Sequence, residues 1–271
     1  MKYKYIIVIS NIIIIFFLLM IVLLPLFSAE PGVGVYIRHI TLFFTILLII
    51  ILICLNAFFF YNYRLLSLLE REDWPALAYY LEQKIIVKGQ YSVQKVRILA
   101  SSYIVISDYA SVFKLENKAM HIKPVVVKKN ALIFGSARVL SGNYADAAAF
   151  LRPYRGNDEW TRWFCGFSAL LSGSFDQVEP DFLFLAASSR DMLITGLSAY
   201  FLFKNLSKHS ARQKECLSAA ENGCSRVKKT IKDAECWKKE AEKMADQIHI
   251  TIIRKYIDEA GDWIFSGSMV T

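Results

Sequence analysis

Two long apolar runs dominate the first quarter of the chain. Residues 5–27 and 40–61 hold few polar side chains and no charge. At about 1.5 Å per residue, each run is long enough to cross a hydrocarbon core of about 30 Å. Residues 28–39 separate them and contain one proline and two glycines, which favour a break. The pattern predicts a two-helix transmembrane anchor over residues 1–63.

A cleaved signal peptide is the alternative interpretation of the first run, because Lys2 and Lys4 precede it. The apolar core of a signal peptide is only about 7–15 residues long, and this run is longer. Phe27 also stands where a small residue is needed before Ala29 at a cleavage site. We therefore expect an anchor that stays in the mature protein.

Basic residues beside the apolar runs predict their orientation. Two lysines precede the first run, and Arg64, Arg71, Lys84 and Lys88 follow the second. The short loop between the runs has one arginine against one glutamate. Short segments rich in Lys and Arg stay on the cytoplasmic side, so we expect both chain ends in the cytoplasm.

From Leu65 onward the apolar residues recur at helical spacing. Residues 65–71 are expected to continue the second membrane helix. Beyond them, four aromatic residues each follow a turn and begin a helix; they are Trp74, Tyr109, Tyr144 and Phe175, at spacings of 35, 35 and 31 residues. Such a period is typical of helical solenoids. The sequence therefore predicts pairs of helices, joined by tight turns, over residues 64–208.

Two stretches in this region repeat most closely. Residues 135–144 read GSARVLSGNY, and residues 166–175 read GFSALLSGSF. In each stretch an apolar helix face ends at a Ser-Gly pair. Gly142 and Gly173 are expected to supply the positive φ that stops the helix, after which the aromatic residue starts the next one.

The glycine and aromatic positions resemble the tetratricopeptide repeat, whose period is about 34 residues. The residues that carry the resemblance are Gly135, Gly142, Tyr144 and Ala147 in one unit, and Gly166, Gly173 and Phe175 in the next. The resemblance implies that Gly135 and Gly166 let the second helix of each pair approach closely. It also implies that Ala147 lies at the crossing and that the ring packs between pairs. The tryptophan of the family's first helix is absent in most units.

The resemblance further implies a concave groove, lined by the first helix of each pair, that binds a partner protein. The groove residues on this pattern include Arg97, Ser101, Lys129, Ser136, Trp160, Trp163 and Phe167. One end of the groove is then basic and polar, and the other is aromatic. Trp163 and Phe167 have a second interpretation, as core residues packed between helix pairs.

Residues 209–271 are predicted to form C-terminal capping helices. A fifth helix pair is expected from Asp191, and residues 227–256 read as one charged helical stretch with a narrow apolar stripe. The last repeat of a solenoid needs a polar outer face, which favours a cap. A surface or partner-binding helix is the alternative. Pro180 is expected to shift, kink or split the helix that begins at Phe175.

The composition shows a net positive charge, and the sequence contains no recognisable catalytic motif. The chain has 271 residues, is 55% apolar and carries a net charge of +8. Its five cysteines have no metal-ligand spacing, and its four histidines are scattered. Phosphate-binding, dinucleotide-binding and zinc-protease motifs are absent from the sequence. We expect no catalytic residue, no metal site, no cofactor and no nucleic-acid partner.

These observations predict a two-span inner-membrane protein with an all-α, tetratricopeptide-like solenoid. Two membrane helices followed by such repeats are similar in layout to the HemY-like inner-membrane proteins associated with bacterial porphyrin metabolism. The expected function is a scaffold or adaptor that recruits a protein partner to a membrane complex. The alternative is a structural or self-associating subunit whose transmembrane helices make the main contacts.

Overall fold

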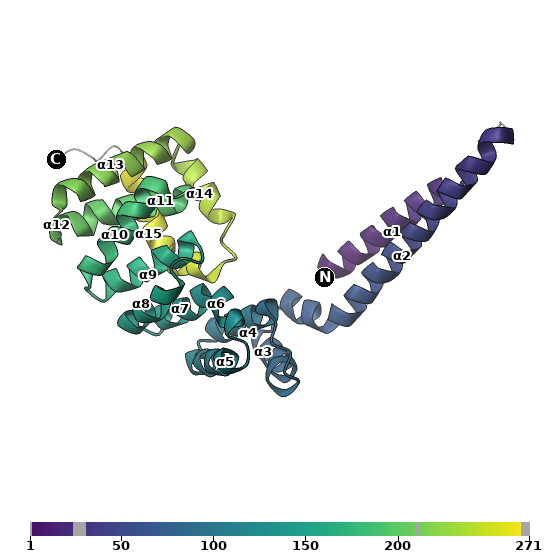
Figure 1. The fold of residues 1–271 in the computed structure, drawn as a ribbon, viewed down its shortest axis with the longest axis horizontal. Helices are drawn as coiled ribbons and strands as arrows, with labels where there is room; N and C mark the ends of the chain where they lie inside the picture. Colours follow the sequence, from purple (N-terminus) through teal and green to yellow (C-terminus); the bar gives the residue numbers. More distant parts are fainter. Residues whose placement is uncertain (1, 24–30, 210–211, 267–271) are drawn as a thin grey trace. The chain divides into compact units, whose positions relative to one another are not determined.

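The computed structural model describes residues 2–23, 31–209 and 212–266, and every regular element in this part of the chain is a helix (Figure 1). The all-α fold class is therefore confirmed. The chain forms two compact units, residues 1–80 and residues 81–271.

The helices in the first part of the chain are α1 (Lys2–Leu23), α2 (Pro31–Glu70), α3 (Trp74–Glu82), α4 (Val93–Val105), α5 (Tyr109–Ile122), α6 (Pro124–Lys129), α7 (Ala131–Leu140) and α8 (Tyr144–Leu151). The later helices are α9 (Glu159–Leu171), α10 (Phe175–Ser188), α11 (Met192–Phe201), α12 (Ser207–His209), α13 (Gln213–Thr230), α14 (Ala234–Glu242) and α15 (Ile248–Phe265). Short π-helical turns at Gln83–Val87 and Leu202–Leu206 follow α3 and α11, and a 3₁₀ turn at Arg152–Tyr154 follows α8.

In the first unit, α1 and α2 contain two stretches long and apolar enough to cross a membrane, Tyr5–Leu23 and Ile40–Glu70. The break expected over residues 28–39 is wrong from Pro31 onward, because α2 begins there. Proline suits the first turn of a helix, since the amide it lacks has no intrahelical partner there. The two glycines that follow weaken a helix by about 1 kcal/mol each but do not end this one. Residues 24–30 lie outside the described residues.

A pair of asparagines joins the two apolar helices. The Asn11 side chain donates to Asn56 Oδ1 at 3.1 Å, and the Asn56 side chain donates to Asn11 Oδ1 at 3.0 Å. Asn56 also donates to the Leu52 carbonyl oxygen at 2.8 Å. An amide in hydrocarbon is costly unless it is hydrogen-bonded. Each asparagine therefore stabilises the pairing of α1 with α2.

All four predicted turns have the same backbone conformation. The residue two positions before each ring has a positive φ; these residues are Glu72 (52°), Ser107 (60°), Gly142 (80°) and Gly173 (79°). The next amide in each turn bonds the carbonyl five residues back, for example Asn143 N to Arg138 O at 2.9 Å and Ser174 N to Ala169 O at 2.9 Å. This is the Schellman motif, which satisfies the last carbonyls of a helix.

The helix after each turn begins at the predicted ring, so the starts at Trp74, Tyr109, Tyr144 and Phe175 are confirmed. Two of the turns lack glycine, although a positive φ costs other residues about 1–2 kcal/mol. In those turns an aspartate caps the next helix: Asp73 Oδ1 accepts from Ala76 N at 3.2 Å, and Asp108 Oδ1 accepts from Ser111 N at 3.1 Å. The sequence thus uses glycine or a capping aspartate to make the same turn.

The close approaches implied by Gly135 and Gly166 occur in the structure. A Cβ on Gly135 would lie 2.6 Å from Leu151, and a Cβ on Gly166 would lie 2.8 Å from Phe182. Each contact joins residues sixteen positions apart, so the two helix pairs pack equivalently. Ala147 is fully buried.

In the second unit, α4 packs on α5, α7 on α8, α9 on α10, and α11 on α13. The first helices of these pairs contact one another in the order α4, α7, α9, α11. One hydrophobic core runs from α7 to α15.

Two expectations about the later helices need correction. Helix α10 runs through Pro180 to Ser188, so of the effects expected from this proline the split does not occur. The stretch 227–256 is not one helix, because α13 ends at Thr230 and two further helices follow. Asp233 begins α14 by accepting a bond from Cys236 N at 2.8 Å. Helix α15 then runs to Phe265, beyond the end expected for it.

Candidate interaction site

The C-terminal helix α15 lies against the first helices of the stack. It contacts α7 and α11 as well as α13 and α14 (Figure 1). Its buried residues recur at helical spacing; they are His249, Ile250, Ile253, Ile257, Ala260, Gly261, Trp263 and Ile264. A stripe of this kind is how an amphipathic helix fills a groove on another protein. Here the chain supplies that helix itself.

Aromatic rings of α9 form much of the surface on which α15 packs, which we call the seat of α15. The His249 ring lies 4.9 Å from Trp160 and 5.8 Å from Phe164, measured between centroids. Further along α15, the Tyr256 ring lies 5.3 Å from Phe167. Burying an aromatic or branched aliphatic side chain contributes about 1.5–3 kcal/mol. With eight buried positions, α15 is an integral part of the core and not a loosely held strap.

The aromatic half of the expected groove is therefore covered. Trp163 is 0% exposed and Phe167 is 1% exposed, so the core interpretation holds for both. Ser136 is fully buried on α7. Trp160 is half-buried and donates from Nε1 to Asp191 Oδ2 at 3.1 Å. In this conformation the four side chains face the chain's own helices and do not form an open surface.

The basic half of the expected groove is open. Arg97 and Lys129 are exposed, and Ser101 is half-buried. Arg97 donates to Asn130 Oδ1 at 3.2 Å and to the Lys129 carbonyl oxygen at 3.4 Å. The Asn130 side chain in turn donates to the Val93 carbonyl oxygen at 3.1 Å. These bonds bring α4, α6 and the start of α7 together and hold the guanidinium at the surface.

Trp237 on α14 is a central residue that the sequence pattern did not single out beyond an apolar stripe. It is 0% exposed, and its Nε1 donates to the Ile257 carbonyl oxygen at 2.9 Å. A Cβ on Gly196 of α11 would lie 2.5 Å from this ring, and a Cβ on Gly261 of α15 would lie 2.7 Å from it. Because these two glycines lack a side chain, the indole fits between α11 and α15 and links both helices to α14.

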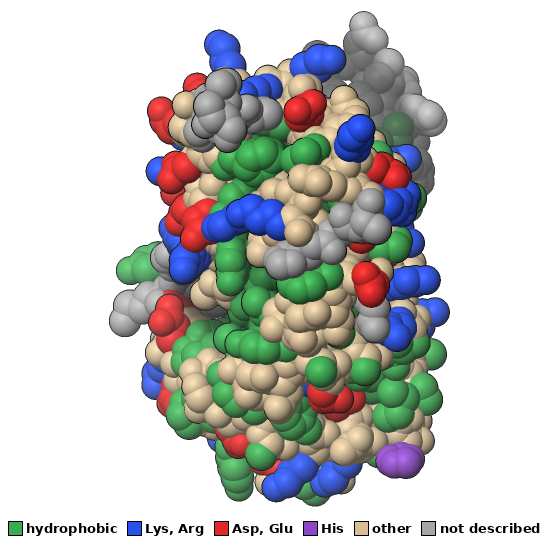
Figure 2. Space-filling view, turned by 90° about the vertical axis from the view of Figure 1, so that its left-hand side faces the viewer, with side chains coloured by type: hydrophobic (Ala, Val, Ile, Leu, Met, Phe, Trp, Pro, Cys, Tyr) green, Lys and Arg blue, Asp and Glu red, His purple; other side chains and the backbone are tan. Residues whose placement is uncertain are grey.

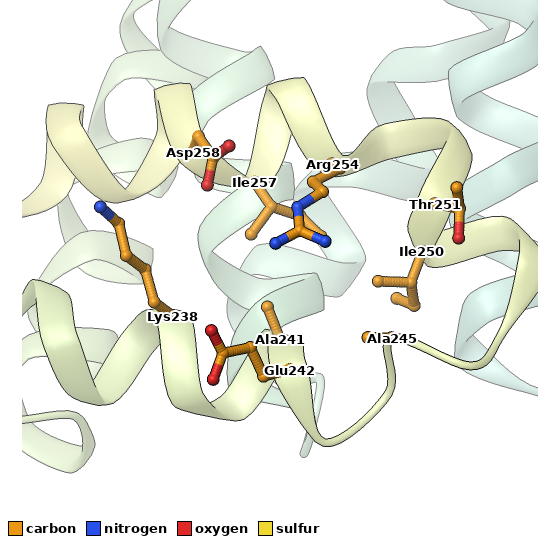
Figure 3. A pocket seen from close by; sticks show the side chains of 9 residues that line it. All are labelled: Lys238, Ala241, Glu242, Ala245, Ile250, Thr251, Arg254, Ile257 and Asp258. Atoms are coloured by element: carbon orange, nitrogen blue, oxygen red, sulfur yellow. The ribbon is translucent and has the colours of Figure 1, made fainter.

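A pocket of about 400 Å³ lies between α14 and α15 (Figure 3). Lys238 and Glu242 come from α14, and Arg254 and Asp258 come from α15, with the Arg254 guanidinium pointing into the space (Figure 3). Ile250 and Ile257 contribute apolar lining. The pocket thus combines a mixed charged rim with an apolar floor. Among the described residues, no group of three or more His, Cys, Asp or Glu is placed to hold a metal ion.

His249 is the most strongly perturbed titratable group at this site. Burial lowers the pKa of its imidazole to about 4; the charge of Arg97 acts in the same direction, and Asp158 and Asp246 oppose it. Its Nε2 has no hydrogen-bond partner among the described residues. The imidazole is therefore neutral at pH 7, and a proton on it would place a charge between the rings of Trp160 and Phe164.

Acidification is expected to weaken the seat of α15 through His249. Since the folded pKa is depressed, this stability is fully present above the unfolded value of about 6.5 and is lost as pH falls toward 4. The loss by pH 4 is about 3 kcal/mol, because each pKa unit corresponds to about 1.4 kcal/mol. His249→Gln should flatten this part of the dependence, measured by thermal melts of the full-length protein in detergent between pH 7.5 and 4. The exposed His121→Gln variant is the control and should keep the wild-type slope; an unchanged slope in His249→Gln would contradict the assignment.

The fold and site define a class: an all-helical protein in which stacked helix pairs, closed by their own C-terminal helix, follow two helices long and apolar enough to span a membrane. The chain belongs to the family described as "Uncharacterised Treponema protein", which matches residues 111–266. The matched region contains α15 in full. The chain is also similar to an "Uncharacterized protein" of Treponema pallidum (strain Nichols), with 27% identity over 240 residues, covering 84% of this chain and 76% of the relative.

Proposed function

We propose that this protein is a membrane-anchored scaffold that recruits another protein to a membrane complex. In this proposal the helix pairs are tetratricopeptide-like repeats, both chain ends are cytoplasmic and the membrane is the inner membrane. The partner binds the open, basic half of the groove, around Arg97, Ser101 and Lys129. The scaffold has no catalytic role of its own.

The seat of α15 is the observation that carries the proposal. The first helices of the stack accept a helix along their aromatic half, and the same row continues onto α4, where Arg97 is exposed and held in place by Asn130. Arg is one of the residue types that dominate binding hot spots. An acidic helix or segment that continues the line of α15 has both the shape and the charge for this surface.

The two apolar helices support the anchor in this proposal. The reciprocal bonds between Asn11 and Asn56 leave neither amide dependent on another protein. They also make α1 a structural companion of α2, which favours an anchor over a removed signal peptide. Fixing the second unit at the membrane raises the local concentration of whatever it captures.

Site-specific photocrosslinking in native membranes tests the proposal. A benzophenone amino acid at Ser101 of the full-length protein should give an adduct with a second protein. That adduct should fall at least tenfold in the Arg97→Ala, Lys129→Ala double variant. It should persist when the exposed Lys239, on α14, and Lys243, directly after α14, are replaced by Ala instead.

Two results would reject the scaffold. Adducts that contain only a second copy of this chain would favour the self-associating subunit. A partner that co-purifies equally well with residues 1–80 alone would place the main contacts on the membrane helices.

A further inference from the structure

A corner between α5 and α6 exposes aliphatic side chains within a basic segment. Ile122 is 60% exposed and Val125 is 55% exposed. Lys123 lies between them in sequence, and Pro124 starts α6. Aliphatic side chains that remain this exposed contribute little hydrophobic stabilisation to the fold, because most of their surface stays in water. We call residues 118–125 the basic corner.

The charge around the corner has one sign. Residues 114–129 contain five lysines, Lys114, Lys118, Lys123, Lys128 and Lys129, all of them exposed. The acid in the same stretch, Glu116, is 6% exposed and is paired with Arg138 at 2.7 Å. On the face shown in Figure 2, basic and acidic side chains are intermixed around apolar ones. The corner therefore presents positive charge and aliphatic side chains without an exposed carboxylate in its own segment.

We propose that the basic corner docks on an anionic lipid surface, with Ile122 and Val125 entering the headgroup region and Lys118 and Lys123 binding lipid phosphates. Aliphatic side chains flanked by lysines are the combination that holds peripheral segments at a bilayer interface. Single-stranded nucleic acid would instead favour Phe, Tyr or Trp side chains on which bases stack, and the basic corner contains none of these three residue types. The basic corner does not include the groove residues Arg97, Ser101 and Lys129, and the proposal shares with the proposed function only the membrane anchor.

The chain offers a reason for this partner. The second unit is joined covalently to helices long and apolar enough to lie in a bilayer. A tethered unit meets the lipid surface at a high effective concentration, so a few weak contacts suffice to hold it. Each lysine near an anionic surface strengthens docking by a factor of about five.

The test uses the full-length protein reconstituted in nanodiscs of phosphatidylcholine alone or with about one third phosphatidylglycerol. An environment-sensitive fluorescent amino acid replaces Val125. We expect a blue shift of its emission and slower amide exchange over residues 118–125 only in the anionic discs. In the Lys118→Glu, Lys123→Glu variant the docked-to-free ratio should fall by at least 25-fold, because two favourable contacts are lost. The Lys239→Glu, Lys243→Glu variant should behave as wild type.

Three outcomes would overturn the proposal. The first is the same emission and exchange in both kinds of disc. The second is a response to anionic lipid that survives the Lys118, Lys123 reversal. The third is a stronger response to a single-stranded oligonucleotide or an acidic peptide than to phosphatidylglycerol. Circular dichroism of each variant checks that the exposed substitutions leave the fold intact, and Ile122→Gln provides a second variant that removes apolar contact without changing charge.

Discussion

Replacing Trp237 by alanine is expected to destabilise the second unit by roughly 3–5 kcal/mol, the usual cost of deleting a fully buried tryptophan. The indole is 0% exposed and its Nε1 bonds the Ile257 carbonyl oxygen at 2.9 Å. Its loss leaves a cavity among α11, α14 and α15 and an unpaired carbonyl. We expect the thermal midpoint of the full-length protein in detergent to fall by about 10 °C. Protease cleavage over residues 243–247, ahead of α15, should become faster.

A double-mutant cycle separates the fit of the indole from general damage. A Cβ added at Gly261 would lie 2.7 Å from Trp237, so Gly261→Ala is expected to cost about 1–3 kcal/mol through overpacking. In the Trp237→Ala background that cost should largely disappear, because the atoms it meets are gone. Gly156→Ala is the control, since a Cβ there meets nothing within 4 Å. Additive effects of Gly261→Ala and Trp237→Ala would contradict the packing described here.

The local features of this fold could be predicted because they depend on a few residues each. The helix starts at Trp74, Tyr109, Tyr144 and Phe175 follow from turn chemistry within five or six residues. The close approach at Gly135 repeats at Gly166 for the same reason. Helix type and turn position are short-range properties, and a near-regular spacing reinforces them.

The position of α15 could not be predicted, because it depends on contacts far apart in the chain. His249 meets Trp160 across almost ninety residues, and Tyr256 meets Phe167 across a similar distance. The stripe on α15 is visible in the sequence, but a stripe does not say which surface it covers. The rings of Trp163 and Phe167 therefore suited a groove or a core equally well until α15 was placed.

The helix start at Pro31 is a local feature that the sequence pattern predicted wrongly. Proline and glycine usually break a helix, but proline favours its first turn. The apolar run that follows has enough helical preference to carry two glycines near its start. Whether proline starts or ends a helix depends on its position in the turn, and the sequence alone does not determine that position.

Arg138 joins three helices through a nearly buried network. Its guanidinium bonds both oxygens of Glu116 on α5, at 2.7 Å and 3.1 Å, and Asp146 on α8, at 2.8 Å. It also stacks 4.0 Å from the Phe150 ring centroid. The side chains of Arg138 and Glu116 are 11% and 9% exposed. Planar, bidentate pairing of this kind cannot be reproduced by lysine.

Arg138→Met is therefore expected to destabilise the second unit by about 3–5 kcal/mol, because Glu116 is left buried without its counter-charge. Adding Glu116→Gln should restore most of the loss, since the double variant buries no unpaired charge. Arg138→Lys should fall between the two. Thermal melts in detergent measure all three, with Lys239→Met as the control: that lysine pairs with Glu235 at 2.7 Å, but both side chains are largely exposed, so little change is expected. If the double variant is less stable than Arg138→Met, the unpaired charge of Glu116 is not the cause of the loss.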